Sequence, residues 1–176
     1  ITYIVMDNQI YGLTKGQTSP RSAEGFKTKS TPEGSIESTL SPLEIALSAG
    51  ATFVAQSFSS DLKQLTALIE AGLQHKGFSL INVFSPCVTF NKINTYDWFK
   101  ENIVNLDQFE DYDPSNRVAA MNKIMETGGM LTGLIYQDKG RKSYEDLAVG
   151  FKQEALAKQD LKLSEGDFDK LLAEFK

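Results

Sequence analysis

A short polar stretch near the start of the chain combines residue types that can bind a metal ion and a phosphate group. It spans residues 8–16 and reads NQIYGLTKG. The amide oxygen of Asn8 is a hard ligand that suits Mg²⁺, while Gly12 and Gly16 would let backbone N–H groups approach an anion. Thr14 could donate a hydrogen bond, and Lys15 could pair with a carboxylate or a phosphate. The stretch therefore predicts a metal and anion site or, because Asn and Gly also dominate ordinary turns, a simple polar turn.

The only cysteine and the only histidine of the chain offer little chemistry when each is considered alone. Cys87 follows a predicted strand in the stretch Ser85-Pro86-Cys87, and an isolated cysteine is most often a small buried apolar residue. It cannot form an intrachain disulfide, and this fits a reducing, cytoplasmic setting. His75 lies near the end of a predicted helix, where an imidazolium would interact favourably with the helix dipole, and we expect it to be structural.

The elements that must position these residues alternate between strand and helix. Strands are expected at residues 1–6, 52–56, 79–84 and 129–136, and the nearly continuous apolar character of the first predicts that it is buried. Helices are expected at 41–50, between Ser60 and Gly77, and near 95–104 and 115–126. This order predicts an α/β fold with a mostly parallel sheet and flanking helices. Ligands of such sheets bind beyond the carboxyl ends of the strands, where residues 7–40 and 85–90 would lie.

Composition restricts the classes of protein to which the chain can belong. Its 176 residues suit a single domain covering 1–176, with a helical, charged tail from about 140 to 176. The net charge of −5 argues against general binding to nucleic acid, which would require a basic face. No apolar run approaches the ~20 residues that span a bilayer, so we expect no membrane partner.

Several stretches together resemble the β subunit of 2-oxoacid:ferredoxin oxidoreductases, and most closely the 2-oxoglutarate type. The resemblance covers roughly residues 1–160. It is carried by Asn8–Gln17, Thr31-Pro32-Glu33-Gly34, His75-Lys76-Gly77-Phe78, Ser85-Pro86-Cys87-Val88-Thr89-Phe90-Asn91, Asn94–Lys100 and Tyr112-Asp113-Pro114. It implies the thiamine-diphosphate-binding fold and a role in forming acyl-coenzyme A and reduced ferredoxin from a 2-oxoacid. A separate α subunit, ferredoxin, coenzyme A and the 2-oxoacid are the implied partners.

The resemblance also implies roles for individual residues. Asn8 would bind Mg²⁺ through its side chain and Ile10 through its backbone carbonyl, while Tyr11, Gly12, Leu13 and Thr14 would line thiamine diphosphate. Lys15 would select 2-oxoglutarate by pairing with its second carboxylate, the alternative being a solvated loop lysine. Cys87 would be the fourth thiolate of a 4Fe–4S cluster.

The chain departs from the pattern of this family in three places. No Gly-Asp-Gly sequence, whose aspartate would be the other metal ligand, occurs in the chain, and the three further cluster cysteines are absent. We therefore expect a C-terminal fragment that is inactive and cluster-free by itself and binds thiamine diphosphate weakly or not at all. Arg21 replaces a small or hydroxyl residue, and we expect its charge to face a partner subunit or solvent. A non-catalytic binding or assembly module and a pyruvate-type enzyme of the same family remain the alternatives.

Overall fold

The computed structural model describes residues 1–148, 156–158, 162 and 164–175. The chain separates into two compact units, Ile1–Ser143 and Tyr144–Lys176. The second unit contains the short helices α5 (Tyr144–Leu147), η2 (Leu156–Lys158) and α6 (Glu165–Ala173), and part of the helical tail predicted from about 140 to 176 lies outside the described residues. Among the described helices, none has the length and apolar character needed to cross a bilayer.

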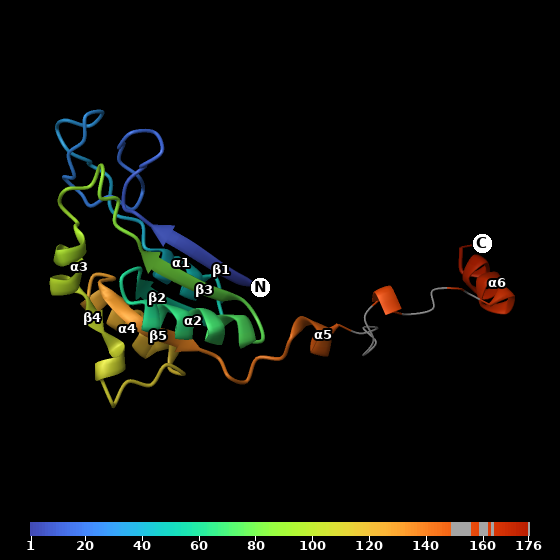
Figure 1. Cartoon of the computed structure of the whole chain (residues 1–176). Helices are drawn as coiled ribbons and strands as arrows, with labels where there is room; N and C mark the ends of the chain where they lie inside the picture. Colours follow the sequence, from blue (N-terminus) through green and yellow to red (C-terminus); the bar gives the residue numbers. More distant parts are fainter. Residues whose placement is uncertain (149–155, 159–161, 163, 176) are drawn as a thin grey trace. The chain divides into compact units, whose positions relative to one another are not determined.

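The first unit is built on a five-stranded sheet in the order β1-β3-β2-β5-β4 (Figure 1). The strands are β1 (Thr2–Asp7), β2 (Phe53–Phe58), β3 (Ser79–Phe84), β4 (Val104–Asn105) and β5 (Leu131–Gln137). The first three are mutually parallel, and β4 is parallel to β5. Only the pairing of β5 with β2 is antiparallel, so the predicted mostly parallel α/β fold is confirmed. The two-residue strand β4 is too short to leave a periodic pattern in the sequence.

Helices cover both faces of the sheet. They are α1 (Pro42–Ser48), α2 (Leu62–Gln74), α3 (Tyr96–Asn102), the 3₁₀ turn η1 (Leu106–Gln108) and α4 (Arg117–Glu126). On one face, Leu47 of α1 and Ile124 of α4 belong to the same apolar cluster as Val54 and Leu80 of the strands. On the other face, Leu68 of α2 packs with strand residues that alternate with these, such as Ile81. This alternation is the period of two that a strand between two helical layers must have.

Strand β1 differs from the prediction because it is largely exposed. It lies at the edge of the sheet and pairs only with β3, from Thr2 opposite Ser79 to Asp7 opposite Phe84. Tyr3 is 57% exposed and Met6 71% exposed, whereas the side chain of Asp7 at the end of the strand is buried. The expectation of a buried first strand is therefore wrong for this chain, because an apolar run shows β character but not which neighbours cover the strand.

Candidate cofactor site

The two loops that the sequence singles out lie together at one edge of the sheet. Strands β1 and β3 are parallel neighbours that end in register, so residues 8–40 and 85–95 both leave from their carboxyl ends (Figure 1). The N–H of Ser85 donates to the carbonyl of Asp7 at 2.9 Å, and the side-chain nitrogen of Asn8 donates to the carbonyl of Ser85 at 2.6 Å. These two bonds join the loops at the point where both begin.

Asn8 and Ile10 present two oxygens that could hold a hard cation. Because the nitrogen of the Asn8 amide is engaged by Ser85, the amide oxygen is directed away from that bond. Gln9 between them adopts a left-handed backbone with φ of 57°, supported by a 3.3 Å bond from its N–H to the carboxylate of Asp7. The Ile10 side chain is buried, which fixes the backbone at this position. In the described part of the chain, no group donates a hydrogen bond to the Asn8 amide oxygen or the Ile10 carbonyl, so both oxygens fit Mg²⁺.

Residues 11–17 form a closed turn beyond these ligands. The N–H of Tyr11 donates to the carbonyl of Gln17 at 3.0 Å, and the N–H of Gly16 donates to the carbonyl of Tyr11 at 2.8 Å. At the exposed tip, Leu13 is 99% exposed, and Lys15 has a left-handed backbone with φ of 74°. The hydroxyl of Thr14, a candidate donor to an anion, donates instead to the side-chain oxygen of Gln17.

Cys87 lies against this turn. A Cβ atom added to Gly12 would be 3.3 Å from the Cys87 sulfur, so the glycine leaves just enough space for the thiol. Cys87 is a half-buried free cysteine, and its carbonyl accepts a 2.9 Å bond from the N–H of Asn91. The structure therefore brings the candidate diphosphate loop and the candidate cluster cysteine into contact. Within the described residues, no group of three or more His, Cys, Asp and Glu side chains could hold a metal ion.

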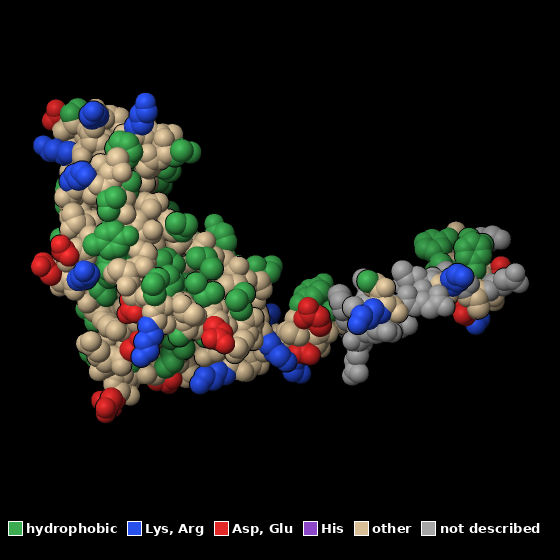
Figure 2. All heavy atoms as spheres, viewed as in Figure 1, with side chains coloured by type: hydrophobic (Ala, Val, Ile, Leu, Met, Phe, Trp, Pro, Cys, Tyr) green, Lys and Arg blue, Asp and Glu red, His purple; other side chains and the backbone are tan. Residues whose placement is uncertain are grey.

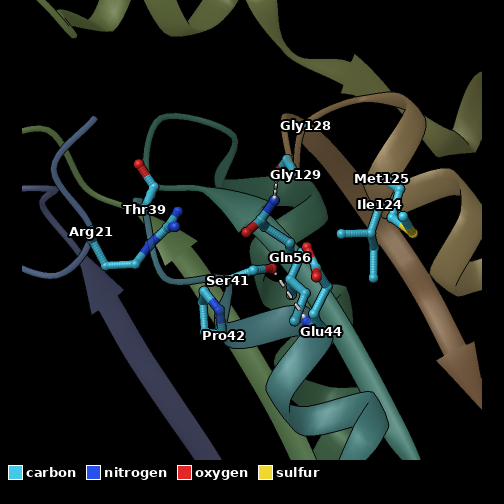
Figure 3. A pocket seen from close by; sticks show the side chains of 11 residues that line it. Arg21, Thr39, Ser41, Pro42, Glu44, Gln56, Ile124, Met125, Gly128 and Gly129 are labelled. Atoms are coloured by element: carbon cyan, nitrogen blue, oxygen red, sulfur yellow. Dashed lines mark hydrogen bonds between the residues drawn. The ribbon is translucent and has the colours of Figure 1, made fainter. Parts of the chain in front are cut away.

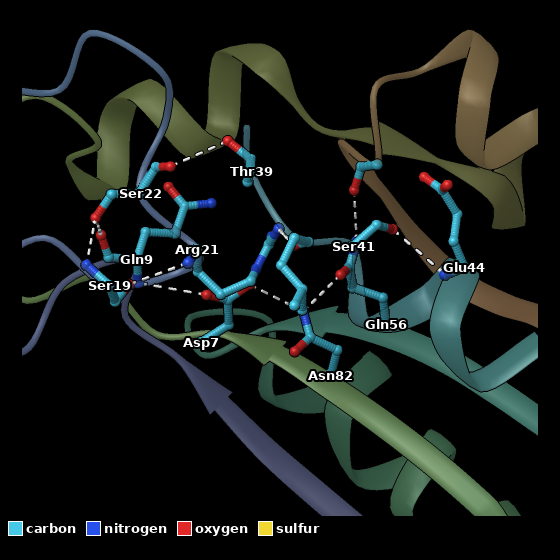
Figure 4. Close-up of polar contacts among 12 residues, drawn as sticks. Asp7, Gln9, Ser19, Arg21, Ser22, Thr39, Ser41, Glu44, Gln56 and Asn82 are labelled. Carbon is cyan, nitrogen blue, oxygen red and sulfur yellow. Dashed lines mark hydrogen bonds and ion pairs between the residues drawn. The ribbon is translucent and has the colours of Figure 1, made fainter. Parts of the chain in front are cut away.

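Arg21 forms an ion pair inside the loops, which contradicts the expectation that its charge faces a partner or solvent. Its Nε and a terminal nitrogen contact one carboxylate oxygen of Asp7 at 2.9 and 2.8 Å, and the guanidinium also donates to the carbonyl of Leu40 (Figure 4). The Asp7 side chain is fully buried, and the Arg21 side chain is 22% exposed. The pair forms because a buried carboxylate needs a cation, and the long connection can return to the end of β1 to supply one.

The same connection is held to the metal-ligand stretch at a second point. The hydroxyl of Ser22 donates to the carbonyl of Gln9 at 2.7 Å, and the hydroxyl of Thr39 donates to the carbonyl of Ser22 at 3.0 Å. Residues 20–40 thus support the backbone on both sides of Asn8, through Asp7 and through Gln9.

A polar network crosses the sheet beneath the loops. The side-chain nitrogen of Asn82 in β3 donates to Asp7 at 3.2 Å and to the side-chain oxygen of Gln56 in β2 at 2.6 Å. The nitrogen of Gln56 in turn donates to the carbonyls of Gly129 and Leu131 at 2.8 and 2.6 Å. The buried Asn82 side-chain oxygen has no hydrogen-bond partner among the described residues. The sequence contains the signal for this network, since Asn82 and Gln56 are amides within apolar strands, but sequence reasoning gave them no role.

A cavity of about 320 Å³ opens beside this network (Figure 3). Arg21 and Thr39 come from the long connection, Glu44 comes from α1, and Gln56 and Gly129 come from β2 and the turn before β5. The charged side chains that line the cavity, Arg21 and Glu44, are of opposite sign, and Arg21 is already paired with Asp7. We therefore assign the cavity to the support of the loops.

Two titratable groups with shifted pKa values, His75 and Asp113, lie away from the loops. His75 caps the carboxyl end of α2, where its Nε2 lies 2.8 Å from the hydroxyl of Thr52. Burial lowers the pKa of His75, an effect that Asp138 partly opposes, so the neutral ring is favoured over the imidazolium expected at the end of a helix. The exposed Asp113 has a lowered pKa because the N–H and the hydroxyl of Ser115 both donate to it, as in an ordinary solvated turn.

Two family models match adjoining stretches of the chain. Residues 1–83 match the family model described as "Thiamine pyrophosphate enzyme, C-terminal TPP binding domain". Residues 87–153 match the model for the C-terminal part of the pyruvate ferredoxin oxidoreductase beta subunit. The first includes the Asn8 loop, and the second begins at Cys87.

Individual relatives agree with these models. A 2-oxoacid:ferredoxin oxidoreductase subunit beta from Sulfolobus sp is 40% identical over 153 residues, which are 81% of this chain and 50% of that protein. The 2-oxoglutarate oxidoreductase subunit KorB of Mycobacterium tuberculosis is 45% identical over 91 residues, 52% of this chain and 24% of that protein.

A solved structure extends the agreement to the whole fold. The 2-oxoglutarate:ferredoxin oxidoreductase from Magnetococcus marinus, solved with 2-oxoglutarate, coenzyme A and succinyl-CoA bound, aligns with a TM-score of 0.79 and 36% identity. The alignment covers 99% of this chain and 58% of that one. The chain therefore spans about half the length of the curated relatives that it matches over most of its own length.

Proposed function

This chain belongs to the family of 2-oxoacid:ferredoxin oxidoreductase β subunits. From that membership we propose that it supplies part of the thiamine diphosphate site of an enzyme that oxidatively decarboxylates 2-oxoglutarate. The observation that carries the proposal is the contact between two loops at the carboxyl ends of β1 and β3. Asn8 and Ile10 lie in one loop, Cys87 lies in the other, and the Cys87 sulfur occupies the space beside Gly12 that a larger side chain would need.

The Asn8 loop would serve as the anchor of the cofactor. The Asn8 amide oxygen and the Ile10 carbonyl would be two ligands of Mg²⁺, with the other ligands coming from the cofactor's diphosphate, water and groups outside this chain. Thiamine diphosphate, when bound, supplies the carbanion chemistry of the reaction. The turn from Tyr11 to Thr14 would lie along it, and its closed hydrogen bonds would keep the backbone from reorganising when the ligand binds.

Lys15 would determine the substrate specificity. The left-handed backbone at Lys15 costs free energy for a residue with a Cβ. Such conformations persist where the surrounding structure enforces them, and they cluster at ligand-binding and active sites. Its ammonium would pair with the carboxylate of 2-oxoglutarate that does not react, a group that pyruvate lacks. The KorB relatives and the Magnetococcus marinus structure, each named for 2-oxoglutarate, support this choice.

Cys87 would be one of four thiolate ligands of a 4Fe–4S cluster that passes electrons to ferredoxin. The chain can supply only this one thiolate, so the other three would come from outside it. We further propose that the chain works with an α subunit and that coenzyme A accepts the acyl group.

The metal assignment is tested by Asn8→Ala in the assembled enzyme. Loss of a direct metal ligand should weaken Mg²⁺-dependent binding of thiamine diphosphate by about tenfold or more, measured by calorimetric titration. Asn102→Ala, which removes an exposed asparagine from α3, is the matched control. Unchanged affinity in Asn8→Ala would remove Asn8 from the site.

The substrate assignment is tested by Lys15→Ala in the same enzyme. The value of kcat/KM for 2-oxoglutarate should fall far more than that for pyruvate, because only the first substrate loses an ion pair. Equal losses on the two substrates would contradict a role in selection.

A further inference from the structure

Two hydrogen bonds hold the peptide groups on either side of Gln9, which lies between the two proposed metal ligands. Its N–H, in the peptide group that follows Asn8, donates to the carboxylate of Asp7 at 3.3 Å. Its carbonyl, in the peptide group that precedes Ile10, accepts from the hydroxyl of Ser22 at 2.7 Å (Figure 4). Because Gln9 has a left-handed backbone, the two bonds hold a conformation that costs free energy for a residue with a Cβ. Rotation of either peptide group would change the relative positions of the Asn8 and Ile10 oxygens.

The hydroxyl of Ser22 has a fixed direction. The residue is 2% exposed, and its hydroxyl oxygen accepts a 3.0 Å bond from the N–H of Ser19. The hydroxyl hydrogen is then directed to the carbonyl of Gln9. The N–H of Ser22 also donates to the carbonyl of Ser19 at 2.9 Å, so residues 19–22 form a closed turn around the hydroxyl. The backbone of this turn therefore sets where the Ser22 hydroxyl can bond.

The neighbouring residue, Arg21, supports the other bond of Gln9 through Asp7. Two guanidinium nitrogens contact Oδ2 of the carboxylate, which leaves Oδ1 for the N–H of Gln9. Two lysines of the same connection differ, because Lys27 and Lys29 are exposed and line a surface groove. Blue side chains project from the upper loops in the space-filling view (Figure 2). Arg21 instead turns inward to the buried carboxylate, as such a charge requires.

Arg21 and Ser22 are themselves held by the end of the long connection. The guanidinium of Arg21 donates to the carbonyl of Leu40. The hydroxyl of Thr39 donates to the carbonyl of Ser22 at 3.0 Å. The N–H of Leu40 donates to the carbonyl of Pro20 at 2.8 Å. These three bonds close the long connection on itself just before α1 begins, so neither Arg21 nor Ser22 depends on a single contact.

We propose that Arg21 and Ser22 form a clamp that positions the two proposed Mg²⁺ ligands without touching the metal ion. In this clamp, Ser22 holds the carbonyl of Gln9 directly, and Arg21 holds its N–H through Asp7. Mg²⁺ requires near-ideal octahedral geometry, whereas Ca²⁺ accepts irregular sets of ligands. The clamp therefore favours Mg²⁺ over the larger ion. This inference rests on the proposed function, because it concerns the metal site that is assigned there.

The test is calorimetric titration of the assembled enzyme with thiamine diphosphate, once with Mg²⁺ and once with Ca²⁺. Ser22→Ala should weaken the Mg²⁺-supported binding by about tenfold, the usual effect of losing a group that orients a metal ligand. The Ca²⁺-supported binding should weaken less, so the preference of the site for Mg²⁺ should fall. Ser35→Ala is the matched control, since it removes a buried hydroxyl of the same connection that accepts from the N–H of Glu37. Both titrations of this control should match those of the parent.

Arg21→Met is a second variant, which leaves the Ser22 hydroxyl in place. It should also lower the preference for Mg²⁺, and Arg21→Lys should restore part of that preference because lysine keeps a cation beside Asp7. In the unloaded 176-residue chain, hydrogen exchange at the N–H of Gln9 should be faster in Ser22→Ala and in Arg21→Met. The amides of β3 should stay protected as in the parent, which shows that the variants are folded. Unchanged exchange at Gln9 in both variants would contradict the clamp.

Three titration results would overturn the proposal: unchanged Mg²⁺-supported binding in Ser22→Ala, equal weakening with the two ions, and equal weakening in Ser35→Ala. Either kind of equal weakening would mean that the Ser22 hydroxyl only stabilises the loops in general. The Asn8→Ala titration separates this failure from that of the metal assignment. If Asn8→Ala weakens binding and Ser22→Ala does not, the metal site stands and the clamp is wrong. If Asn8→Ala has no effect, the metal assignment itself is wrong.

Discussion

The sheet and the loops at its carboxyl ends are held by different forces. In the sheet, Phe53, Ile81, Phe84 and Ile135 are fully buried, and their contacts are apolar and need no particular direction. In the loops, few apolar side chains are buried, and position is set by the Arg21–Asp7 ion pair and by directed hydrogen bonds. The sheet therefore supplies most of the stability, while the loops supply the geometry of the site.

The two regions are joined through Asp7. Its backbone belongs to β1, whereas its carboxylate contacts Arg21 of the long connection, Asn82 of β3 and the N–H of Gln9. A substitution of Asp7 or of Arg21 should therefore alter the conformation of the loops without unfolding the sheet.

The largest effect on stability should come from the aromatic cluster at the end of the sheet. Phe84 is fully buried, and its ring centroid lies 4.8 Å from that of Phe99. Phe84→Ala should lower the free energy of unfolding by about 3–5 kcal/mol through lost burial and a cavity, as measured by urea denaturation. Phe84→Leu should cost only about 1–2 kcal/mol, because it keeps most of the volume. Similar costs for the two variants would mean that this region is not close-packed.

An intermediate effect should follow from Arg21→Met, and it should be confined to the loops. Removing the guanidinium leaves the buried Asp7 carboxylate without a cation, at a cost of about 2–4 kcal/mol because Arg21 is partly exposed. Cleavage by a protease should become faster within residues 8–40, while the far-ultraviolet circular dichroism of the sheet and helices stays unchanged.

The double variant Arg21→Met/Asp7→Asn is the control for this interpretation. It removes both charges and retains an acceptor for the N–H of Gln9, so it should recover part of the lost stability. If the double variant is no more stable than the single one, the ion pair does not hold the loop.

The smallest effect should be the pH dependence of the free energy of unfolding that is due to His75. This residue belongs to the sheet region and not to the loops. Its pKa is lower in the folded chain than the usual value of about 6.5, because burial disfavours the charged ring. At pH values between the pKa of His75 in the folded chain and its pKa in the unfolded chain, the unfolded chain binds more protons than the folded one. The free energy of unfolding should therefore fall as the pH is lowered from about 6.5 toward the pKa of the folded chain. The difference in urea midpoint between the parent chain and His75→Gln should change over that range, and a constant difference would contradict the shifted pKa.

Local patterns in the sequence were sufficient for most elements of the first unit. Strand β3 lies at Ser79–Phe84 as predicted, and α1 begins after Ser41, whose hydroxyl accepts a 3.3 Å bond from the N–H of Glu44. These features depend on residues a few positions apart, which a sequence displays directly. The short strand β4 and the antiparallel direction of β5 depend on distant partners and were not predicted.

The sequence by itself determined that the Asn8 stretch and Cys87 follow parallel strands and that their residue types suit a cofactor site. Only the tertiary structure decided that Cys87 lies beside Gly12, that Arg21 turns inward to Asp7, and that Lys27 and Lys29 share a groove with Lys15. The physical reason is that strand order and loop closure bring together groups separated by many residues. No local propensity records these distances, and the free energy that fixes them comes from burial and charge pairing in the folded chain.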